Sequence, residues 1–165
     1  MVSTETAGPL IVQGDSSILL DVHHESAEEA RSDIGPFAEL EKSPEHMHTY
    51  RITPLSLWNA ASAGYDGDEV VRRLAIWSRF AVPENVVYSI YDIMSRFGKL
   101  VLTPVEGETH RLFLRVDDET VRKEIEWNRT AMKYLSPAER GFYVELLDRG
   151  NIKQVLIKAG YPVKD

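Results

Sequence analysis

The chain has 165 residues, of which 43% are hydrophobic and none is cysteine, and its formal net charge is −7. This composition can fill one packed core and a small second unit, and it excludes disulfides, thiolate metal sites and cysteine nucleophiles. No stretch approaches the ~20 apolar residues of a membrane span, and the opening residues lack the pattern of a signal peptide, so we expect a cytoplasmic protein, nucleoid-associated if the source is bacterial.

The first third of the chain is acidic and predicts short strands. Residues 1–50 hold ten acidic and two basic side chains, whereas the later residues hold nearly equal numbers of both. An acidic surface repels phosphate, so this third is a poor candidate for binding nucleic acid. Short apolar runs bounded by turn residues predict strands at residues 9–14, 17–22 and 46–53.

Four helices are expected between residues 26 and 98. Each has apolar side chains at helical spacing and begins at a capping residue or a proline. The expected caps or first residues are Ser26, Thr53, Asp66 and Pro83. The inward faces of the last three helices are expected to bury Trp58, Leu74, Trp77, Ile90 and Phe97.

The rest of the chain predicts a hairpin and then a helical tail. Residues 99–116 alternate apolar and polar side chains around Gly107, which indicates a β-hairpin. Three short helices followed by a hairpin are the element order of a winged helix, so we expect such a core over residues 53–117. A capping-box pattern at Ser136 predicts helices in the remaining residues. The expected fold class is α+β: short N-terminal strands and a helix, a winged-helix-like three-helix bundle with a hairpin, and a helical C-terminal tail.

Two motifs suggest metal chemistry but lack its other parts. His46, His48 and Tyr50 share one face of the third expected strand, because alternate residues of a strand point the same way. A zinc site needs a third or fourth ligand, and no other histidine stands at a suitable spacing. The acidic run that begins at Asp117 resembles a magnesium-binding strand end, yet no phosphate-binding loop precedes it, so we interpret it as a helix cap. We therefore expect no metal site and no catalytic residues.

Two segments are candidates for contact with nucleic acid. The helix at residues 83–98 occupies the place of a recognition helix, but its exposed positions carry two acidic residues and one basic residue, too few cations for several phosphates. We expect this helix to be a packing or partner surface. Basic and aromatic residues interleave late in the chain, where a solvated helix face is the alternative interpretation. The candidate nucleic-acid contacts there are Arg140, Arg149, Lys153 and Lys158.

Several segments resemble the N-terminal domain of XPB-type DNA repair helicases, the actinobacterial relatives of the TFIIH helicase. The resemblance is carried by "GPLIVQGDSSILLDV", "HMHTYRITPLSLW", "VPENVVYSIYDIMSRFGKLVL" and "RGNIKQVLIKAGYPVKD". It covers residues 8–116 and 139–165. It implies an XPB-like N-terminal domain over residues 8–130 and, over residues 131–165, a segment that resembles the start of the family's damage-recognition region.

The resemblance also implies a role. Members of this family are 3′–5′ ATPases whose ATP and magnesium motifs lie downstream of the similar region, so ATP and Mg²⁺ are implied for the helicase core alone, and no cofactor and no enzyme activity are expected of this chain. The expected role is regulatory docking onto the helicase core or a like-folded partner domain, with weak DNA contact and no membrane contact. The expected docking residues are His46, His48, Tyr50, Tyr88 and Tyr91. A DNA-binding winged-helix module and a stand-alone regulator remain alternatives.

Overall fold

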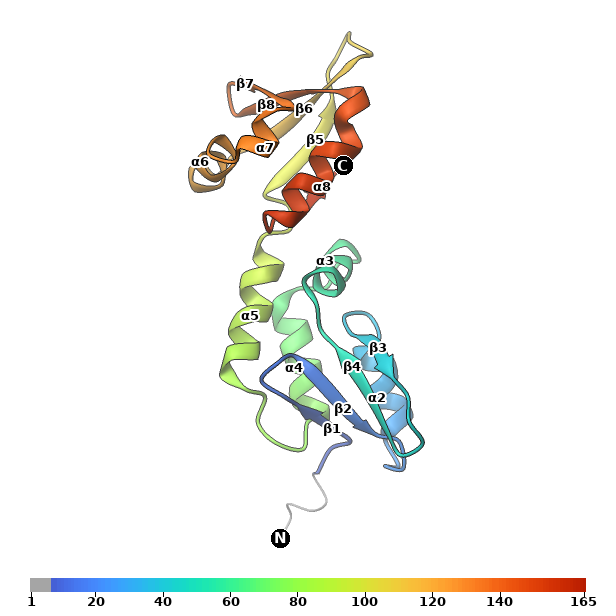
Figure 1. Cartoon of the computed structure of the whole chain (residues 1–165). Helices are drawn as coiled ribbons and strands as arrows, with labels where there is room; N and C mark the ends of the chain where they lie inside the picture. Colours follow the sequence, from blue (N-terminus) through green and yellow to red (C-terminus); the bar gives the residue numbers. More distant parts are fainter. Residues whose placement is uncertain (1–6) are drawn as a thin grey trace. The chain divides into compact units, whose positions relative to one another are not determined.

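Two separate hydrophobic cores organise residues 7–165, the part of the chain that this computed structural model describes. The chain divides after Ser95, and each of the two units has its own core, its own sheet and its own helices (Figure 1). The described residues form seven α-helices and two sheets, so the predicted α+β class is confirmed.

The first unit is built on a four-stranded antiparallel sheet with the strand order β1-β2-β4-β3. Its strands are β1 (Leu10–Val12), β2 (Ser17–Asp21), β3 (Glu39–Lys42) and β4 (Met47–Arg51). Its helices are α2 (Ala27–Ile34), α3 (Pro54–Ser62), α4 (Gly67–Trp77) and α5 (Glu84–Ser95). The four helices and three of the strands were predicted from the sequence.

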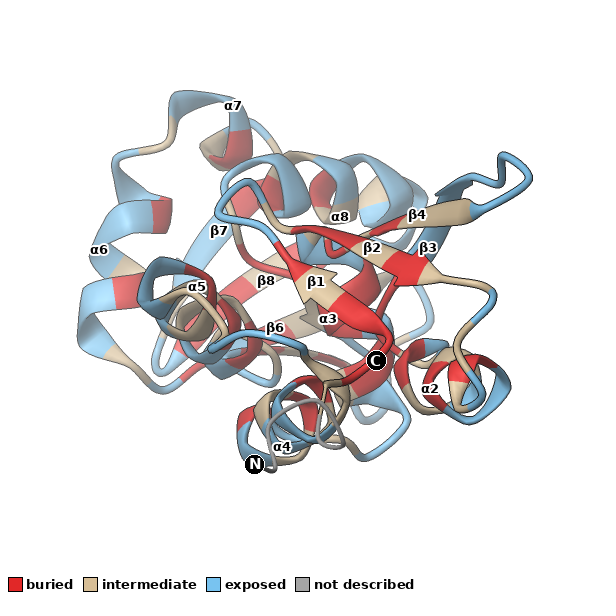
Figure 2. Ribbon diagram, turned by 90° about the horizontal axis from the view of Figure 1, so that it is seen from below, coloured by how far each residue is buried: buried red, intermediate tan, exposed pale blue. Residues whose placement is uncertain are grey.

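Apolar alternation explains why β1 and β2 pair as they do. Leu10 lies opposite Leu20, and Val12 lies opposite Ile18, and all four side chains are buried. Buried residues accordingly appear along both strands in Figure 2. Because side chains alternate between the faces of a strand, this register directs one face of both strands into the core.

Strand β3 was not predicted, because it lacks the apolar signal on which strand prediction depends. All four residues of β3 are exposed, and three of them are charged. The strand pairs with β4 at the edge of the sheet, and its register shifts between Leu40 and Lys42. Charged side chains and an irregular register are ways in which natural sheets protect an edge from pairing with other chains.

The predicted starts of the helices are largely correct. The side chain of Thr53 accepts a hydrogen bond from the backbone N–H of Ser56, whose hydroxyl in turn accepts from the backbone N–H of Thr53. The side chain of Asp66 caps α4 by accepting a hydrogen bond from the backbone N–H of Glu69. Ser26 precedes α2 as predicted, but its side chain makes no capping hydrogen bond.

The second unit has a five-stranded sheet with the order β7-β8-β6-β5-β9. Neighbouring strands are antiparallel except β5 and β9, which are parallel. The strands are β5 (Leu100–Pro104), β6 (Arg111–Val116), β7 (Leu135–Ala138), β8 (Gly141–Glu145) and β9 (Val163–Lys164). The helices are α6 (Glu119–Glu126), α7 (Arg129–Met132), the 3₁₀ turn η1 (Leu146–Asp148) and α8 (Arg149–Lys158).

The prediction of a wholly helical tail was wrong, because residues 135–145 form the hairpin β7–β8. Phe142 and Val144 are buried at alternate positions, which is the pattern of a strand. Arg140 lies in the turn of this hairpin and has a positive φ of 64°. The S-P-A-E pattern at Ser136 therefore does not begin a helix, and the helical part of the tail is α8.

The winged-helix arrangement expected over residues 53–117 is not confirmed. The predicted hairpin β5–β6 is present, but it belongs to the five-stranded sheet of the second unit, whereas the three helices α3, α4 and α5 belong to the first. The boundary expected after residue 130 falls inside α7, within the second unit.

Three of the five residues predicted for the core are buried, and two are partly exposed. Trp58, Leu74 and Ile90 are buried, while Trp77 and Phe97 are partly exposed. The indole N–H of Trp77 donates to the Asp33 carboxylate at 2.8 Å, which explains why this ring lies at the edge of the core. None of the helices in the described part of the chain has the length and apolar character needed to cross a bilayer.

Candidate nucleic-acid interface

The helices of the second unit all pack against one face of its sheet. Side chains from α6, α7 and α8 share a core with alternate residues of the strands. These buried residues are Leu102, Leu114, Phe142, Val144, Val121, Ile125, Ala131, Ile152 and Leu156. The residues between them along each strand point to the opposite face. We call this opposite face the open face; its strand register brings together Val101, Thr103, Arg111, Phe113, Arg115, Ser136, Tyr143, Glu145 and Lys164.

One row of the open face has two aromatic rings between two hydroxyl groups. The register places Thr103 opposite Phe113, Phe113 opposite Tyr143, and Tyr143 opposite Ser136. The rings of Phe113 and Tyr143 meet edge to face with centroids 5.6 Å apart, and both side chains are partly exposed. Aromatic rings on adjacent strands, on the face away from the helices, form a surface on which planar groups can stack.

Gly141 allows the Phe113 ring to reach across onto β8. A Cβ atom at Gly141 would lie 2.9 Å from Cζ of Phe113 and 2.0 Å from the carbonyl oxygen of Leu114. Any other residue at this position would push the ring and the neighbouring strand away. The close approach of the two strands therefore depends on the missing side chain.

Arg111 lies over the ring of Tyr143. Its guanidinium carbon is 4.0 Å from the ring centroid, a cation–π geometry. Nε and Nη2 of Arg111 also donate to the two carboxylate oxygens of Glu108, each at 2.8 Å. These hydrogen bonds lower the pKa of the Glu108 carboxyl and raise that of Arg111. The two hydrogen bonds to Glu108 therefore help to hold the guanidinium over the Tyr143 ring.

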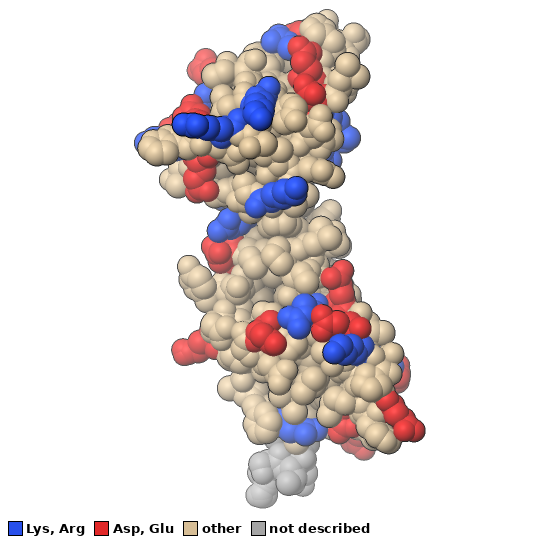
Figure 3. All heavy atoms as spheres, in the orientation of Figure 1, with Lys and Arg blue, Asp and Glu red and all other residues tan. Residues whose placement is uncertain are grey.

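A second row of the open face supplies two more cations. Lys164 lies opposite Val101, which lies opposite Arg115. Both basic side chains are exposed, and Nε of Arg115 is 3.3 Å from Oδ2 of Asp117. Figure 3 shows acidic and basic side chains interspersed over the face of the molecule that is seen in the orientation of Figure 1. The open face therefore combines aromatic rings with three basic side chains, the residue types that contact the bases and phosphates of nucleic acids.

Comparison with known proteins decides the family. Residues 10–139 match the family described as the helicase conserved C-terminal domain. The chain belongs to this helicase family. It is 46% identical over 162 residues to the DNA 3′-5′ helicase XPB of Mycobacterium tuberculosis, and 46% identical over 162 residues to that of Kineococcus radiotolerans. It is also 28% identical over 158 residues to the general transcription and DNA repair factor IIH helicase/translocase subunit XPB of Enterocytozoon bieneusi.

The match covers nearly all of this chain but a minor part of its relatives. It spans 97% of this chain and 29% of the length of each of the two actinobacterial helicases. The resemblance to XPB-type helicases that the sequence motifs indicated is therefore confirmed.

Two of the basic residues predicted as nucleic-acid contacts in this helicase family member are engaged by one carboxylate. Arg149 and Lys153, on α8, both bind Asp165, with Nζ of Lys153 2.9 Å from Oδ1. Partial burial is the largest single influence and opposes ionisation of Asp165, but the hydrogen bonds and charges of Lys153 and Arg149 together outweigh it, so the pKa of this carboxyl is lowered. Arg149 and Lys153 are therefore less available to phosphates than their sequence positions suggested.

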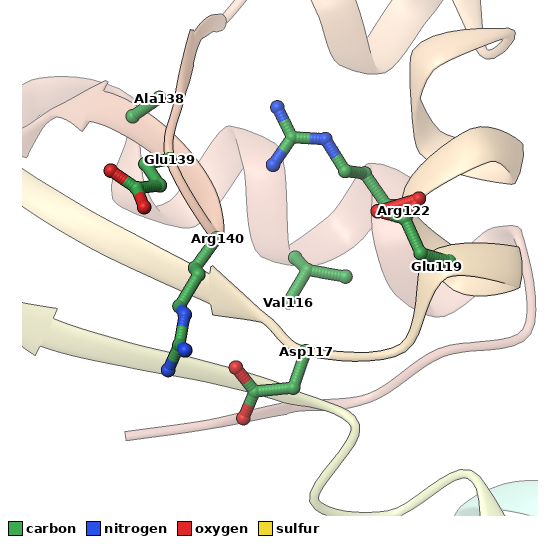
Figure 4. Close-up of a pocket in the computed structure, with 7 residues that line it drawn as sticks. All are labelled: Val116, Asp117, Glu119, Arg122, Ala138, Glu139 and Arg140. Atoms are coloured by element: carbon green, nitrogen blue, oxygen red, sulfur yellow. The ribbon is translucent and has the colours of Figure 1, made fainter.

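The other two predicted contacts lie in different places. Arg140 lies in the turn between β7 and β8 and lines a pocket of about 580 Å³ together with Arg122 and three acidic residues (Figure 4). The acidic residues are Asp117, Glu119 and Glu139. Lys158 is exposed at the end of α8, beside Asn128 and Thr130. The four predicted residues thus do not form one continuous basic surface.

The predicted docking residues of β4 belong largely to the first unit's own structure. Tyr50 is 5% exposed, and its hydroxyl accepts a hydrogen bond from Nε of Arg31 at 3.1 Å. Nη2 of Arg31 also lies 3.3 Å from Nδ1 of His48. His46 is exposed, and its Nδ1 is 2.7 Å from Nε2 of His23. No group of three or more potential metal ligands occurs among residues 7–165.

The two tyrosines predicted on α5 are exposed. Tyr88 is 73% exposed and Tyr91 is 42% exposed. The hydroxyl of Tyr91 donates to Asp68 at 2.5 Å, and this hydrogen bond raises the pKa of Tyr91. The ring of Tyr91 also lies against Gly67, where a Cβ would be 2.6 Å from Cδ1. Tyr88 therefore offers a partner the larger free surface of the two.

The open face itself was missed from the sequence. The alternation of Arg111, Phe113 and Arg115 places these side chains on one face of a strand, and this signal was available. Tyr143 lies in the tail for which the sequence predicts helices, so its side chain is not expected on a strand. Only the hairpin β7–β8 brings Tyr143 beside Phe113, and the sequence pattern at Ser136 pointed away from it.

Proposed function

We propose that this chain is an auxiliary, non-catalytic part of an XPB-type 3′–5′ DNA helicase. In this proposal the second unit contacts DNA through its open face, and the first unit docks onto the helicase core or a like-folded partner domain. ATP and Mg²⁺ act in the helicase core, because the sequence of this chain has no G-K-[ST] phosphate loop. The names of the relatives supply the helicase part of the proposal.

The observation that carries the DNA contact is the open face of the five-stranded sheet. It places Arg111, Arg115 and Lys164 around two aromatic rings, on the side opposite the helices. Cations neutralise phosphates, and release of the condensed counterions makes such binding depend on salt. The tail residues proposed earlier support contact less well, because Asp165 already pairs with Arg149 and Lys153.

Docking by the first unit is supported by its charge and by α5. Residues 1–50 have a net charge of −8, which disfavours DNA on this unit and suits a basic protein partner. Tyr88 presents a nearly free aromatic ring on α5. The winged-helix alternative would use α5 to read DNA, but this helix has acidic Glu84 at its start.

Binding to a fluorescent forked duplex at low and moderate salt tests the DNA contact. We expect weak affinity that falls with added salt, and Arg115→Gln and Lys164→Gln should each reduce the salt slope by roughly one unit. The matched control is the pair Lys153→Gln and Lys158→Gln, which should change the slope less. If the control pair abolished binding and the open-face variants did not, the contact would belong to α8.

Docking is tested by titrating this chain with the Mycobacterium tuberculosis helicase from which the matched segment has been removed. We expect complex formation that Tyr88→Ser weakens. The control is Trp127→Ser, which changes an exposed aromatic residue of the second unit. Complex formation that was insensitive to Tyr88→Ser would move the docking surface away from α5.

A further inference from the structure

We propose that the open face of the second unit binds single-stranded nucleic acid, with Phe113 and the Arg111–Tyr143 pair as stacking surfaces for unpaired bases. The inference rests on the proposed function, because it names the form of nucleic acid that the same face takes. It follows from the register of β5, β6 and β8 and from the contacts among Glu108, Arg111, Phe113 and Tyr143.

The first stacking surface is the ring of Phe113. It lies in the middle strand of the three, between Thr103 and Tyr143, and reaches onto Gly141. The end of the ring lies close to Gly141, which has no side chain to cover it, and the ring is partly exposed. A base that stacks on this ring would have hydroxyl groups of Thr103 and Ser136 at the two ends of the same row.

The second stacking surface is the guanidinium of Arg111, which lies over the ring of Tyr143. The guanidinium carbon is 4.0 Å from the centroid of that ring. Guanidinium planes stack on bases as aromatic rings do. The edge-to-face contact between Tyr143 and Phe113 sets the two surfaces side by side, with ring centroids 5.6 Å apart. Two neighbouring unpaired bases can therefore each stack on a planar group, one on the ring of Phe113 and the other on the Arg111–Tyr143 pair.

Unpaired bases fit this surface better than a duplex does. In a duplex the faces of the bases are hidden by their neighbours, so rings on a sheet cannot stack on them, and stacking therefore selects strands whose bases can be splayed apart. Duplex contact would need cations alone, and the open face has three cations together with acidic Glu145.

Charge complementarity places the backbone of the strand along the edges of the two rings. Arg115 and Lys164 lie in the row on one side of Phe113, and Arg111 lies in the row on the other. In the free protein Glu108 and Asp117 pair with Arg111 and Arg115. Phosphates of a bound strand would replace these carboxylates, so Glu108 competes with the ligand for Arg111.

The test compares two fluorescent strands of about twelve nucleotides, one of thymidines and one abasic, which carry equal phosphate charge. The full chain should bind the thymidine strand roughly tenfold more tightly, because each stacked base contributes to affinity. The double variant Phe113→Leu, Tyr143→Leu keeps apolar bulk but no ring, and its affinity for the thymidine strand should fall to that for the abasic strand. Tyr88→Leu, which removes an exposed ring from the first unit, should leave both affinities unchanged.

A second variant tests whether the loss of affinity in the double variant is caused by misfolding. Glu108→Gln removes the competing carboxylate and should increase affinity for both strands, which misfolding cannot do. Circular dichroism of each variant should match that of the parent chain.

The outcomes separate this inference from the proposed function. Equal affinity for thymidine and abasic strands, with binding that falls with salt, would overturn stacking and leave DNA contact in place. No binding of either strand or of the forked duplex at low salt would overturn both. A preference for thymidine that survived the double variant would overturn the assignment to Phe113 and Tyr143.

Discussion

At the scale of single residues, Trp58 connects two helices of the first unit. It is 7% exposed, and its indole N–H donates to the carbonyl of Ile93 at 2.8 Å, so a side chain of α3 is bonded to the backbone of α5. Trp77, which the helical spacing also placed in the core, lies at its edge instead. A buried ring with a satisfied N–H contributes both area and a hydrogen bond.

We therefore expect Trp58→Ala to lower the free energy of unfolding by about 3–5 kcal/mol, and Trp58→Phe by about 1–2 kcal/mol through loss of the hydrogen bond. The control is Trp127→Ala, because Trp127 is 85% exposed and should change stability by less than about 0.5 kcal/mol. Urea unfolding followed by circular dichroism measures all three. Equal effects of Trp58→Ala and Trp127→Ala would show that the packing of α3 is misassigned.

Two glycines of the second unit should respond in opposite directions to the same change. Gly141→Ala places a Cβ against the carbonyl of Leu114 and the ring of Phe113, and overpacking of this kind costs about 1–3 kcal/mol. Gly150 lies in α8 with no atom within 4 Å of its Cβ position. Gly150→Ala should therefore raise stability by up to about 1 kcal/mol through helix propensity. Thermal melts of both variants test this, and stabilisation by Gly141→Ala would contradict the close strand contact.

At the scale of elements, local capping and apolar alternation predicted most of the helices and strands, and tertiary pairing determined the rest. Thr53 and Asp66 mark the starts of α3 and α4, because a polar side chain bonds the free backbone N–H groups there. Strand β3 was missed because its exposed side chains carry no apolar pattern. The hairpin β7–β8 was missed because S-P-A-E resembles a helix start, while burial against β6 decides the outcome.

The same reasoning explains what could be predicted of the candidate site. Arg111, Phe113 and Arg115 lie on one strand, so their common face follows from the sequence. Their partners Tyr143 and Lys164 come from strands much later in the chain, and strand order depends on long-range packing that no local pattern encodes. The basic residues of the tail were found in the sequence, but their ion pairs with Asp165 were not.

The caps of α2 and α3 offer a matched pair of substitutions. Thr53→Ala removes a side chain that accepts a hydrogen bond from Ser56 and should cost about 1 kcal/mol of stability. Ser26→Ala changes a residue in the equivalent position whose side chain makes no such bond, so it should cost less than about 0.5 kcal/mol. Chemical denaturation measures the difference, and equal costs would mean that the cap of α3 contributes nothing.

At the scale of the whole molecule, carboxylates paired with basic side chains set the response to acid. Hydrogen bonds from Arg51, Arg73 and Arg111 lower the pKa values of Glu41, Glu69 and Glu108 respectively. The ordinary value for such a carboxyl is 4.5. Because each folded-state pKa lies below the unfolded one, the unfolded chain binds more protons in acid.

The stability that these groups contribute is therefore fully present above the ordinary pKa and is lost as the pH falls through the lowered values. We expect the free energy of unfolding to be constant with respect to these carboxyls between about pH 7 and pH 5.5, and to fall below about pH 4.5. The loss should be smaller in high salt, since the pairs are exposed and screened. Urea titrations at several pH values test this, and greater stability at pH 3 than at pH 5 would contradict it.

The parallel pairing of β5 with β9 has a consequence for the order in which the chain folds during synthesis. The first unit is complete in sequence at Ser95, so its sheet can form while the ribosome is still adding later residues. Strand β5 begins at Leu100, but its neighbour β9 is not made until Val163 and Lys164. The edge of β5 that pairs with β9 therefore stays unpaired until nearly all of the second unit has been made, whereas its other edge can pair with β6 much earlier. Until then the free edge is open to pairing with other chains.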